Sequence, residues 1–249
     1  MNFVKNPNFP SRNITVAAVS SEADDIISAL QSAKIAVVPV EPNENLPTGI
    51  ASHADLQILH LGGSSLLTSG CSKNSTDMLN MLGFEIQNTE NDIDFSYPED
   101  CLINAEIIGK NIIVNPDIID RKLMEFAEEN NYNIIGVKQG YAKCSVLAVC
   151  EDAIITADPG ITKILQQKEI EVLKIKEGGI YLRGYDTGFI GGCGGMVEEK
   201  ILGTSGSLKS IKDYDNIRDF LRNRNIYAEN LGGKTLRDIG GILPLCEEE

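Results

Sequence analysis

One local pattern recurs along this chain at nearly regular intervals: a β run, a turn, a second β run, a helix and a third strand. Glycine or acidic turns near residues 62–63, 109–110, 151–152 and 198–199 separate paired apolar runs, as is typical of β-hairpins. The first strands of these pairs begin near Asp55, Cys101, Cys144, Cys193 and Ile242, which are 46, 43, 49 and 49 residues apart. An internal repeat of this kind determines the architecture, so the pattern predicts a single α/β domain over residues 1–249.

Helical spacing follows each hairpin. The spacing predicts helices near residues 74–82, from Pro116 onward, at 161–168 and at 212–223. Third strands are expected near residues 84–87, 133–137, 170–175 and 226–228. Every helix is therefore preceded by two strands and followed by one.

The two ends of the chain supply complementary parts of a fifth unit. Residues 242–245 resemble a first strand with nothing after it, whereas residues 14–40 resemble a second strand, a helix capped by Ser21, and a third strand. The sequence thus predicts a five-fold pseudo-symmetric ββαβ α/β-propeller in which the termini share one unit. The alternative is a doubly wound sheet of ordinary βαβ units. It is disfavoured because strands come in pairs and no GxGxxG follows a first strand.

Charge and hydropathy restrict the partners. The formal charge of −14 disfavours nucleic acid but permits a small cationic substrate. No apolar run approaches the roughly 20 residues that a membrane span needs, so no membrane partner is expected. The N-terminal residues lack an apolar signal core, which favours a cytoplasmic protein with reduced cysteines. The sequence makes no prediction of oligomeric state.

The six cysteines form no CxxC pair, and only two histidines are present. This disfavours a structural zinc site of ordinary spacing, and we expect no cofactor and no metal. The alternative is a thiol-rich site for a soft metal ion, built from Cys101, Cys144, Cys193 and His53.

A cyclic chain of five such units resembles the pentein superfamily, which contains the guanidino-group-modifying enzymes and a non-catalytic branch, the ribosome anti-association factors. The motif His53-Ala-Asp55 is similar to the His-x-Asp of the deiminases. This similarity implies that His53 is a general acid/base and that Asp55 contacts a guanidinium. The run Cys144-Ser145-Val146-Leu147 resembles the nucleophile strand of dimethylarginine dimethylaminohydrolase, which implies that Cys144 is the nucleophile.

The chain departs from the family pattern in two respects. The family carries its nucleophile on the last first strand, but residues 240–242 contain no thiol. In the family the histidine unit also directly precedes the cysteine unit, which would pair His53 with Cys101. We therefore take Cys144 as the expected nucleophile and Cys101 as the alternate one.

These residue types suit chemistry on a guanidinium group. Its carbon is a poor electrophile and needs a thiolate, an imidazole can protonate the leaving amine, and carboxylates can hold the cation in bidentate fashion. Residues that precede the first strands converge on the axis of the ring. We therefore expect His53, Asp55, Cys101, Cys144 and Cys193 to lie near one another.

Three further residues are candidates for substrate binding. Asn104, expected on a strand after Cys101, either lines the central channel or is a satisfied core amide. Asp186 either contacts the guanidinium or builds a turn. Cys193, like the other thiols, either faces the ligand or packs as a small hydrophobic residue.

The sequence thus favours a cysteine-dependent hydrolase or transferase acting on a guanidino compound. The alternative is a non-catalytic pentein-fold protein that binds a ligand or partner. The missing C-terminal cysteine favours that alternative.

Overall fold

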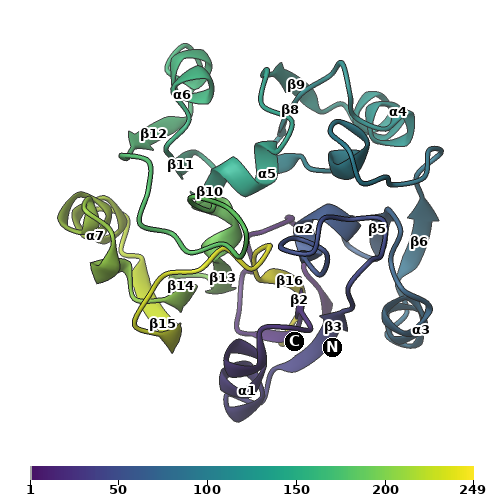
Figure 1. Ribbon diagram of the computed structural model, residues 1–249, viewed down its shortest axis with the longest axis horizontal. Coiled ribbons are helices and arrows are strands. Elements are labelled where there is room, and N and C mark those ends of the chain that lie inside the picture. Colours follow the sequence, from purple (N-terminus) through teal and green to yellow (C-terminus); the bar gives the residue numbers. More distant parts are fainter. Residues whose placement is uncertain (1) are drawn as a thin grey trace.

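Five small sheets surround a central axis in the computed structural model, which describes residues 2–249 (Figure 1). In four of the five, an antiparallel hairpin is followed by a helix and by a third strand parallel to the second. The first of these units contains β4 (Ile58–Gly62), β5 (Ser65–Thr68), α3 (Lys73–Met81) and β6 (Glu85–Asn88). The second contains β7 (Glu106–Ile108), β8 (Asn111–Val114), α4 (Arg121–Glu129) and β9 (Asn133–Gly136). The third contains β10 (Val146–Cys150), β11 (Ala153–Thr156), α6 (Pro159–Leu165) and β12 (Glu171–Lys174). The fourth contains β13 (Gly194–Glu198), β14 (Ile201–Gly206), α7 (Tyr214–Arg222) and β15 (Tyr227–Gly233).

The two termini form the fifth unit together. Its sheet has the order β1-β16-β2-β3, with β1 (Asn2–Phe3), β16 (Leu243–Glu247), β2 (Ile14–Ser20), β3 (Ala36–Val40) and the helix α1 (Asp24–Ser32). In the antiparallel pair β16 and β2, Leu243 lies opposite Ala18 and Pro244 opposite Ala17. This pairing closes the ring, and it confirms the prediction that the termini share one unit.

The helices α1, α3, α4, α6 and α7 lie outside the ring and cover the outer faces of the sheets (Figure 1). In the second unit, Ile112 and Ile113 on β8 are completely buried, as are Leu123 and, almost fully, Ala127 on α4. Successive strand residues point to opposite faces, so both faces of this sheet are covered. Burying a large aliphatic side chain contributes about 1.5–3 kcal/mol. Because the residues on both faces of the strand are buried, the strand sequence is a continuous apolar run.

Two predicted helix starts are wrong. Helix α1 begins at Asp24 rather than Ser21, and its N-cap residue is Ala23, with no side-chain cap. Helix α4 begins at Arg121 rather than Pro116. The side chain of Asn115 accepts a hydrogen bond from the Asp117 N–H at 3.1 Å, which turns the chain locally.

A single helical turn precedes each of four first strands. These turns are α2 (Ala54–Gln57), η1 (Glu99–Cys101), α5 (Ala142–Ser145) and η2 (Gly191–Cys193). Asn104 consequently lies ahead of β7, not on a strand as expected. The turns carry the residues that the sequence places at the axis. No helix within residues 2–249 is long and apolar enough to span a bilayer.

Candidate active site

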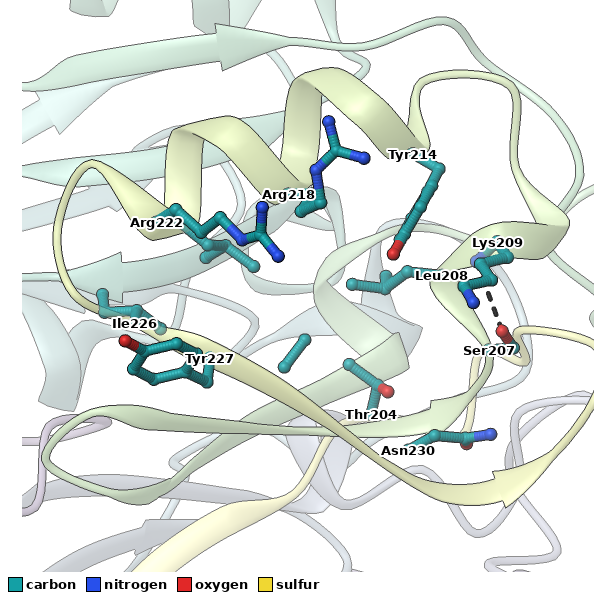
Figure 2. A pocket seen from close by; sticks show the side chains of 12 residues that line it. Thr204, Ser207, Leu208, Lys209, Tyr214, Arg218, Arg222, Ile226, Tyr227 and Asn230 are labelled. Carbon is teal, nitrogen blue, oxygen red and sulfur yellow. Dashed lines mark hydrogen bonds between the residues drawn. The ribbon is translucent and has the colours of Figure 1, made fainter.

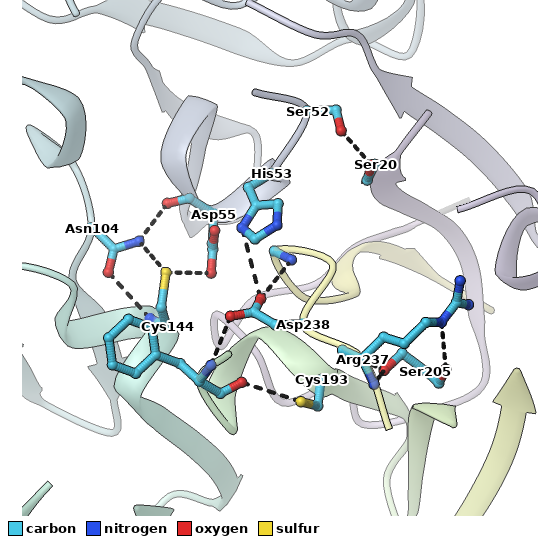
Figure 3. A network of polar contacts seen from close by, with 12 residues as sticks. Ser20, Ser52, His53, Asp55, Asn104, Cys144, Cys193, Ser205, Arg237 and Asp238 are labelled. Carbon is cyan, nitrogen blue, oxygen red and sulfur yellow. Dashed lines mark hydrogen bonds and ion pairs between the residues drawn. The ribbon is translucent and has the colours of Figure 1, made fainter. Parts of the chain in front are cut away.

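Cys144, Asp55 and Asn104 form a buried hydrogen-bonded cluster at the axis, with side chains from three different units (Figure 3). The Cys144 thiol donates to Asp55 Oδ2, with 3.1 Å between Sγ and the oxygen. The Asn104 amide nitrogen donates to the same sulfur at 3.1 Å. The sulfur therefore has one acceptor and one donor, which defines the orientation of its S–H bond.

Asn104 also links the backbones of the two neighbouring units. Its amide nitrogen donates to the Asp55 carbonyl at 3.1 Å, and its Oδ1 accepts from the Cys144 N–H at 3.2 Å. Both ends of this fully buried amide are thus satisfied. Asn104 holds the thiol and the carboxylate at a fixed separation.

His53 faces a second carboxylate, that of Asp238, which the sequence reasoning missed. Its Nδ1 lies 3.7 Å from Asp238 Oδ1. The backbone N–H groups of Phe189 and Gly240 donate to Asp238 at 2.8 and 3.2 Å. Asp238 precedes the fifth first strand, as Asp55 precedes β4, and this shared position in the repeat is the signal that could have identified it.

Two glycines allow the backbone to approach these side chains. A Cβ atom on Gly192 would lie 1.8 Å from Asp238 Oδ1. Gly240 has φ of +72°, and a Cβ there would lie 2.5 Å from the Cα of His53. The His53–Asp238 contact therefore requires glycine at both positions.

The electrostatics of the cluster favour a neutral thiol. Burial raises the pKa of Cys144 well above its usual value, and the charges of Asp55 and Asp238 raise it further. Burial also raises the pKa of Asp238, while His53 lowers it. Asp55 Oδ1 is buried and accepts no hydrogen bond from the described residues. An unpaired buried acceptor beside a thiol can receive an N–H donor from a ligand.

A buried ion pair lies next to this cluster. The Lys143 ammonium is 2.6 Å from Glu106 Oε2, and the Asn8 amide donates to Glu106 Oε1 at 2.7 Å. Burial raises the pKa of Glu106 to about 7, although the charge of Lys143 lowers it. Lys143 directly precedes Cys144 in the chain, so the pair helps to fix the turn that carries the thiol.

The other predicted site residues have different surroundings. The Cys193 thiol donates to the Phe189 carbonyl at 3.1 Å. Burial raises the pKa of Cys193 well above its usual value, and the charge of Asp238 raises it further. The Cys101 thiol donates to the Pro98 carbonyl at 3.3 Å, outside the hydrogen-bonded cluster. Asp186 is exposed on the loop before η2 and makes no hydrogen bond to the cluster.

The thiols do not assemble into a metal site. Among residues 2–249, no group of three or more His, Cys, Asp or Glu side chains has a geometry that could hold a metal ion. Of the predicted residues, the structure brings His53, Asp55, Asn104 and Cys144 together, with Cys193 at the edge.

A surface pocket of about 270 Å³ reaches the histidine side of this centre. His53 and Asp238 line its floor, and Glu22, Ser52 and Arg183 lie around it. The pocket provides a path from solvent to the two buried groups.

Solved structures with the same fold share little sequence with this chain. An inosamine-phosphate amidinotransferase from Streptomyces griseus superposes with a TM-score of 0.63 at 10% identity, covering 100% of this chain and 97% of that one. An amidinotransferase of saxitoxin biosynthesis from Microseira wollei gives a TM-score of 0.57 at 10% identity, with 92% and 91% covered. DDAH from Pseudomonas aeruginosa, in complex with citrulline, gives 0.56 at 10% identity, with 89% and 92% covered. The fold is therefore that of the pentein superfamily, as the repeat predicted.

At the level of sequence, no match was found among curated proteins. A family model described as "Family of unknown function (DUF6873)" matches residues 18–243, which include the whole axial cluster. The chain therefore belongs to the family of unknown function DUF6873, and it has the pentein fold.

Proposed function

We propose that this protein is a cysteine-dependent hydrolase or transferase that acts on a small cationic guanidino compound. One observation carries the proposal: the Cys144 sulfur, hydrogen-bonded to Asp55 and Asn104, is buried near two carboxylates, one of which faces His53. A thiol, an imidazole and two carboxylates are the groups that chemistry on a guanidinium carbon needs.

Substrate binding supplies the charge that activates the thiol. In the free protein, burial and two carboxylates hold Cys144 in its neutral form. A guanidinium that donates to Asp55 Oδ1 and to Asp238 neutralises both carboxylates and places a positive charge beside the sulfur. Both effects lower the thiol pKa, so the nucleophile forms only when the substrate is bound.

The covalent steps then follow. The thiol proton leaves through Asp55 Oδ2, which it already contacts, and passes to His53. The thiolate forms a C–S bond to the guanidinium carbon, and the C–N bond to the leaving amine breaks as His53 protonates that nitrogen. Water in a hydrolase, or an acceptor amine in a transferase, then attacks the same carbon and loses a proton to His53. As the C–S bond breaks, His53 returns this proton to the sulfur and restores the neutral thiol; in the hydrolase, the second proton of water passes to the released amine. Cys144 is the nucleophile, His53 the acid/base, and Asp55 and Asp238 bind the cation.

The second candidate is a non-catalytic protein that binds a cationic ligand. The raised pKa of Cys144 favours it, because a buried neutral thiol between carboxylates is a poor nucleophile. The same carboxylates would bind the cation without any covalent step. Thiol reactivity in the presence of a cationic group separates the two functions.

We expect chloroacetamidine to alkylate Cys144 faster than any of the other five cysteines. The amidinium group mimics the guanidinium, so its charge should lower the thiol pKa while the carboxylates position its reactive carbon. Chloroacetamide, which is similar in shape but neutral, is the matched reagent. We expect the rate ratio of the cationic to the neutral reagent to be at least tenfold larger at Cys144 than at Cys150, as measured by peptide mass spectrometry over time.

The Cys144→Ala variant should lose the fast-reacting site and leave labelling of the other cysteines unchanged. Agmatine or arginine, added in excess, should slow the labelling of Cys144 in the unsubstituted protein. Equal rate ratios at Cys144 and Cys150 would contradict the catalytic proposal. Protection by a guanidino compound without preferential labelling would instead support the binding function.

A further inference from the structure

A larger pocket lies on the outside of the ring, between helix α7 and strands β14 and β15 (Figure 2). Its volume is about 360 Å³, which is within the range of roughly 300–1,000 Å³ for small-molecule sites. It belongs to the fourth unit and shares no lining residue with the axial cluster. Its chemistry is therefore independent of the proposed function.

The connection between β14 and α7 forms part of this pocket. In the fourth unit, residues 207–213 link β14 to α7 and include the helical turn η3 (Leu208–Ser210). The same link consists of residues 157–158 in the third unit and of residues 115–120 in the second, and neither contains a helical turn. The turn η3 forms one wall of the pocket, and the exposed strand β15 forms another.

Two unpaired cations line the pocket. Among residues 2–249, neither Lys209 nor Arg222 forms an ion pair with a carboxylate, although the chain carries a net charge of −14. Arg218 differs, because its guanidinium is held by Asp215 and Asp219 at 2.6 and 2.9 Å. Figure 2 shows Lys209 and Arg222 on two sides of the pocket, with the Arg222 guanidinium turned toward it. The Lys209 ammonium also lies 5.9 Å from the centre of the Tyr214 ring, a weak cation–π contact that leaves its charge without a carboxylate. Two such cations in a hollow of an acidic protein favour an anionic ligand.

The remaining lining suits an anion that carries an organic group. The Tyr214 hydroxyl has no hydrogen-bond partner among the described residues, and the Ser207 hydroxyl accepts from the Lys209 N–H while its own proton stays available. Leu208, Leu221 and Ile226 are buried and line the same pocket. The pocket thus combines hydroxyl donors and cationic side chains with an apolar surface.

We propose that this pocket binds a small organic phosphate. The phosphate group would lie between Lys209 and Arg222 and accept hydrogen bonds from Tyr214 and Ser207, since charge-assisted bonds to phosphate oxygens are strong. The organic part would pack on the leucine and isoleucine side chains. The net charge of −14 disfavours a long polyanion, so we expect a small phosphate monoester rather than nucleic acid.

Isothermal titration calorimetry of the intact protein with phenyl phosphate tests this proposal. We expect saturable binding that Arg222→Gln and Lys209→Gln each weaken about tenfold, the effect of losing one charge-assisted hydrogen bond. Lys168→Gln removes an exposed cation distant in sequence from the pocket and should leave the affinity unchanged. Circular dichroism of each variant checks that the fold is retained.

Two further ligands separate the sources of affinity. Inorganic phosphate should bind at least tenfold more weakly than phenyl phosphate because it leaves the apolar wall exposed, and phenol should not bind. Equal affinity for inorganic and phenyl phosphate would overturn the organic part of the proposal. Absence of phenyl phosphate binding, or binding that neither variant weakens, would overturn the site itself.

Discussion

Replacing Lys143 with methionine is expected to lower the free energy of unfolding by about 3–5 kcal/mol at pH 8, the usual effect of removing one partner of a buried ion pair. The Lys143 ammonium lies 2.6 Å from Glu106, whose side chain is completely inaccessible to solvent. Methionine keeps the length of the side chain, so the loss reflects an uncompensated carboxylate more than a cavity. Urea denaturation followed by circular dichroism measures the change.

The effect should depend on pH. Burial already raises the pKa of Glu106 from 4.5 to about 7, so the folded state binds its proton more tightly than the unfolded state does. This contribution to stability is complete below pH 4.5 and is lost as the pH rises through 7. Without Lys143 the pKa rises further, because the charge that lowers it is gone. The stability difference between variant and unsubstituted protein should therefore grow from pH 5 to pH 8.

Two variants control this experiment. The double variant Lys143→Met/Glu106→Gln should regain most of the lost stability and show a flatter pH profile, because no buried charge remains. Lys73→Met breaks an exposed ion pair with Asp77 and should cause no measurable change. If the single and double variants were equally unstable at every pH, the ion pair would not explain the loss.

The repeat made the fold predictable from sequence. Hairpins, helices and third strands recur at intervals of 43–49 residues, and the termini could be assigned to one unit because each lacked what the other supplied. The boundaries were less predictable where side chains compete for the backbone. The Asn115 side chain accepts a hydrogen bond from the Asp117 N–H and forms a local turn. Helix α4 therefore begins at Arg121, although Pro116 is a suitable first residue for a helix.

The repeat spacing predicted that His53, Asp55 and Cys144 would lie near the axis, but it did not predict their contacts. The family pattern paired His53 with the unit that follows it, which contains Cys101. The structure places the Asp55 carboxylate against Cys144, two units away, and Asn104 connects them. Contacts of this kind depend on which side chain of each helical turn before a first strand faces the axis. The spacing of residues in the sequence does not contain that information.

Asp238 was not predicted from the sequence, for a different reason. Its sequence surroundings, Arg237-Asp238-Ile239-Gly240, resemble an ordinary turn. Asp238 reaches the site only because the ring closes. Closure places the segment before β16 beside the first unit, so that Asp238 Oδ1 lies 3.7 Å from His53 Nδ1. Contacts between the first unit and the unit formed by the two termini can be predicted only once the arrangement of the ring is known.

Replacing Asp55 with asparagine is expected to change two reactivities of Cys144 in opposite directions. Asp55 raises the thiol pKa through its charge and by accepting the thiol hydrogen bond, in addition to the larger effect of burial. An amide of the same shape removes the charge, replaces the carboxylate oxygen with a weaker acceptor, and leaves burial unchanged. Alkylation of Cys144 by neutral chloroacetamide at pH 8 should therefore become about tenfold faster, because a lower thiol pKa increases the fraction of thiolate.

The same substitution should weaken every interaction with a cationic ligand. The preference of Cys144 for chloroacetamidine over chloroacetamide should fall at least tenfold, and agmatine should no longer protect the thiol, because one of the two carboxylates that hold the cation is gone. Asp186→Asn is the matched control: it removes an exposed carboxylate that makes no hydrogen bond to the cluster, so neither rate should change. A slower reaction with both reagents in the Asp55→Asn variant would show that this carboxylate promotes thiolate formation in the free protein, contrary to activation by the substrate. If only Asp186→Asn reduced the cationic preference, the cation would bind at the loop before η2 instead of at the axis.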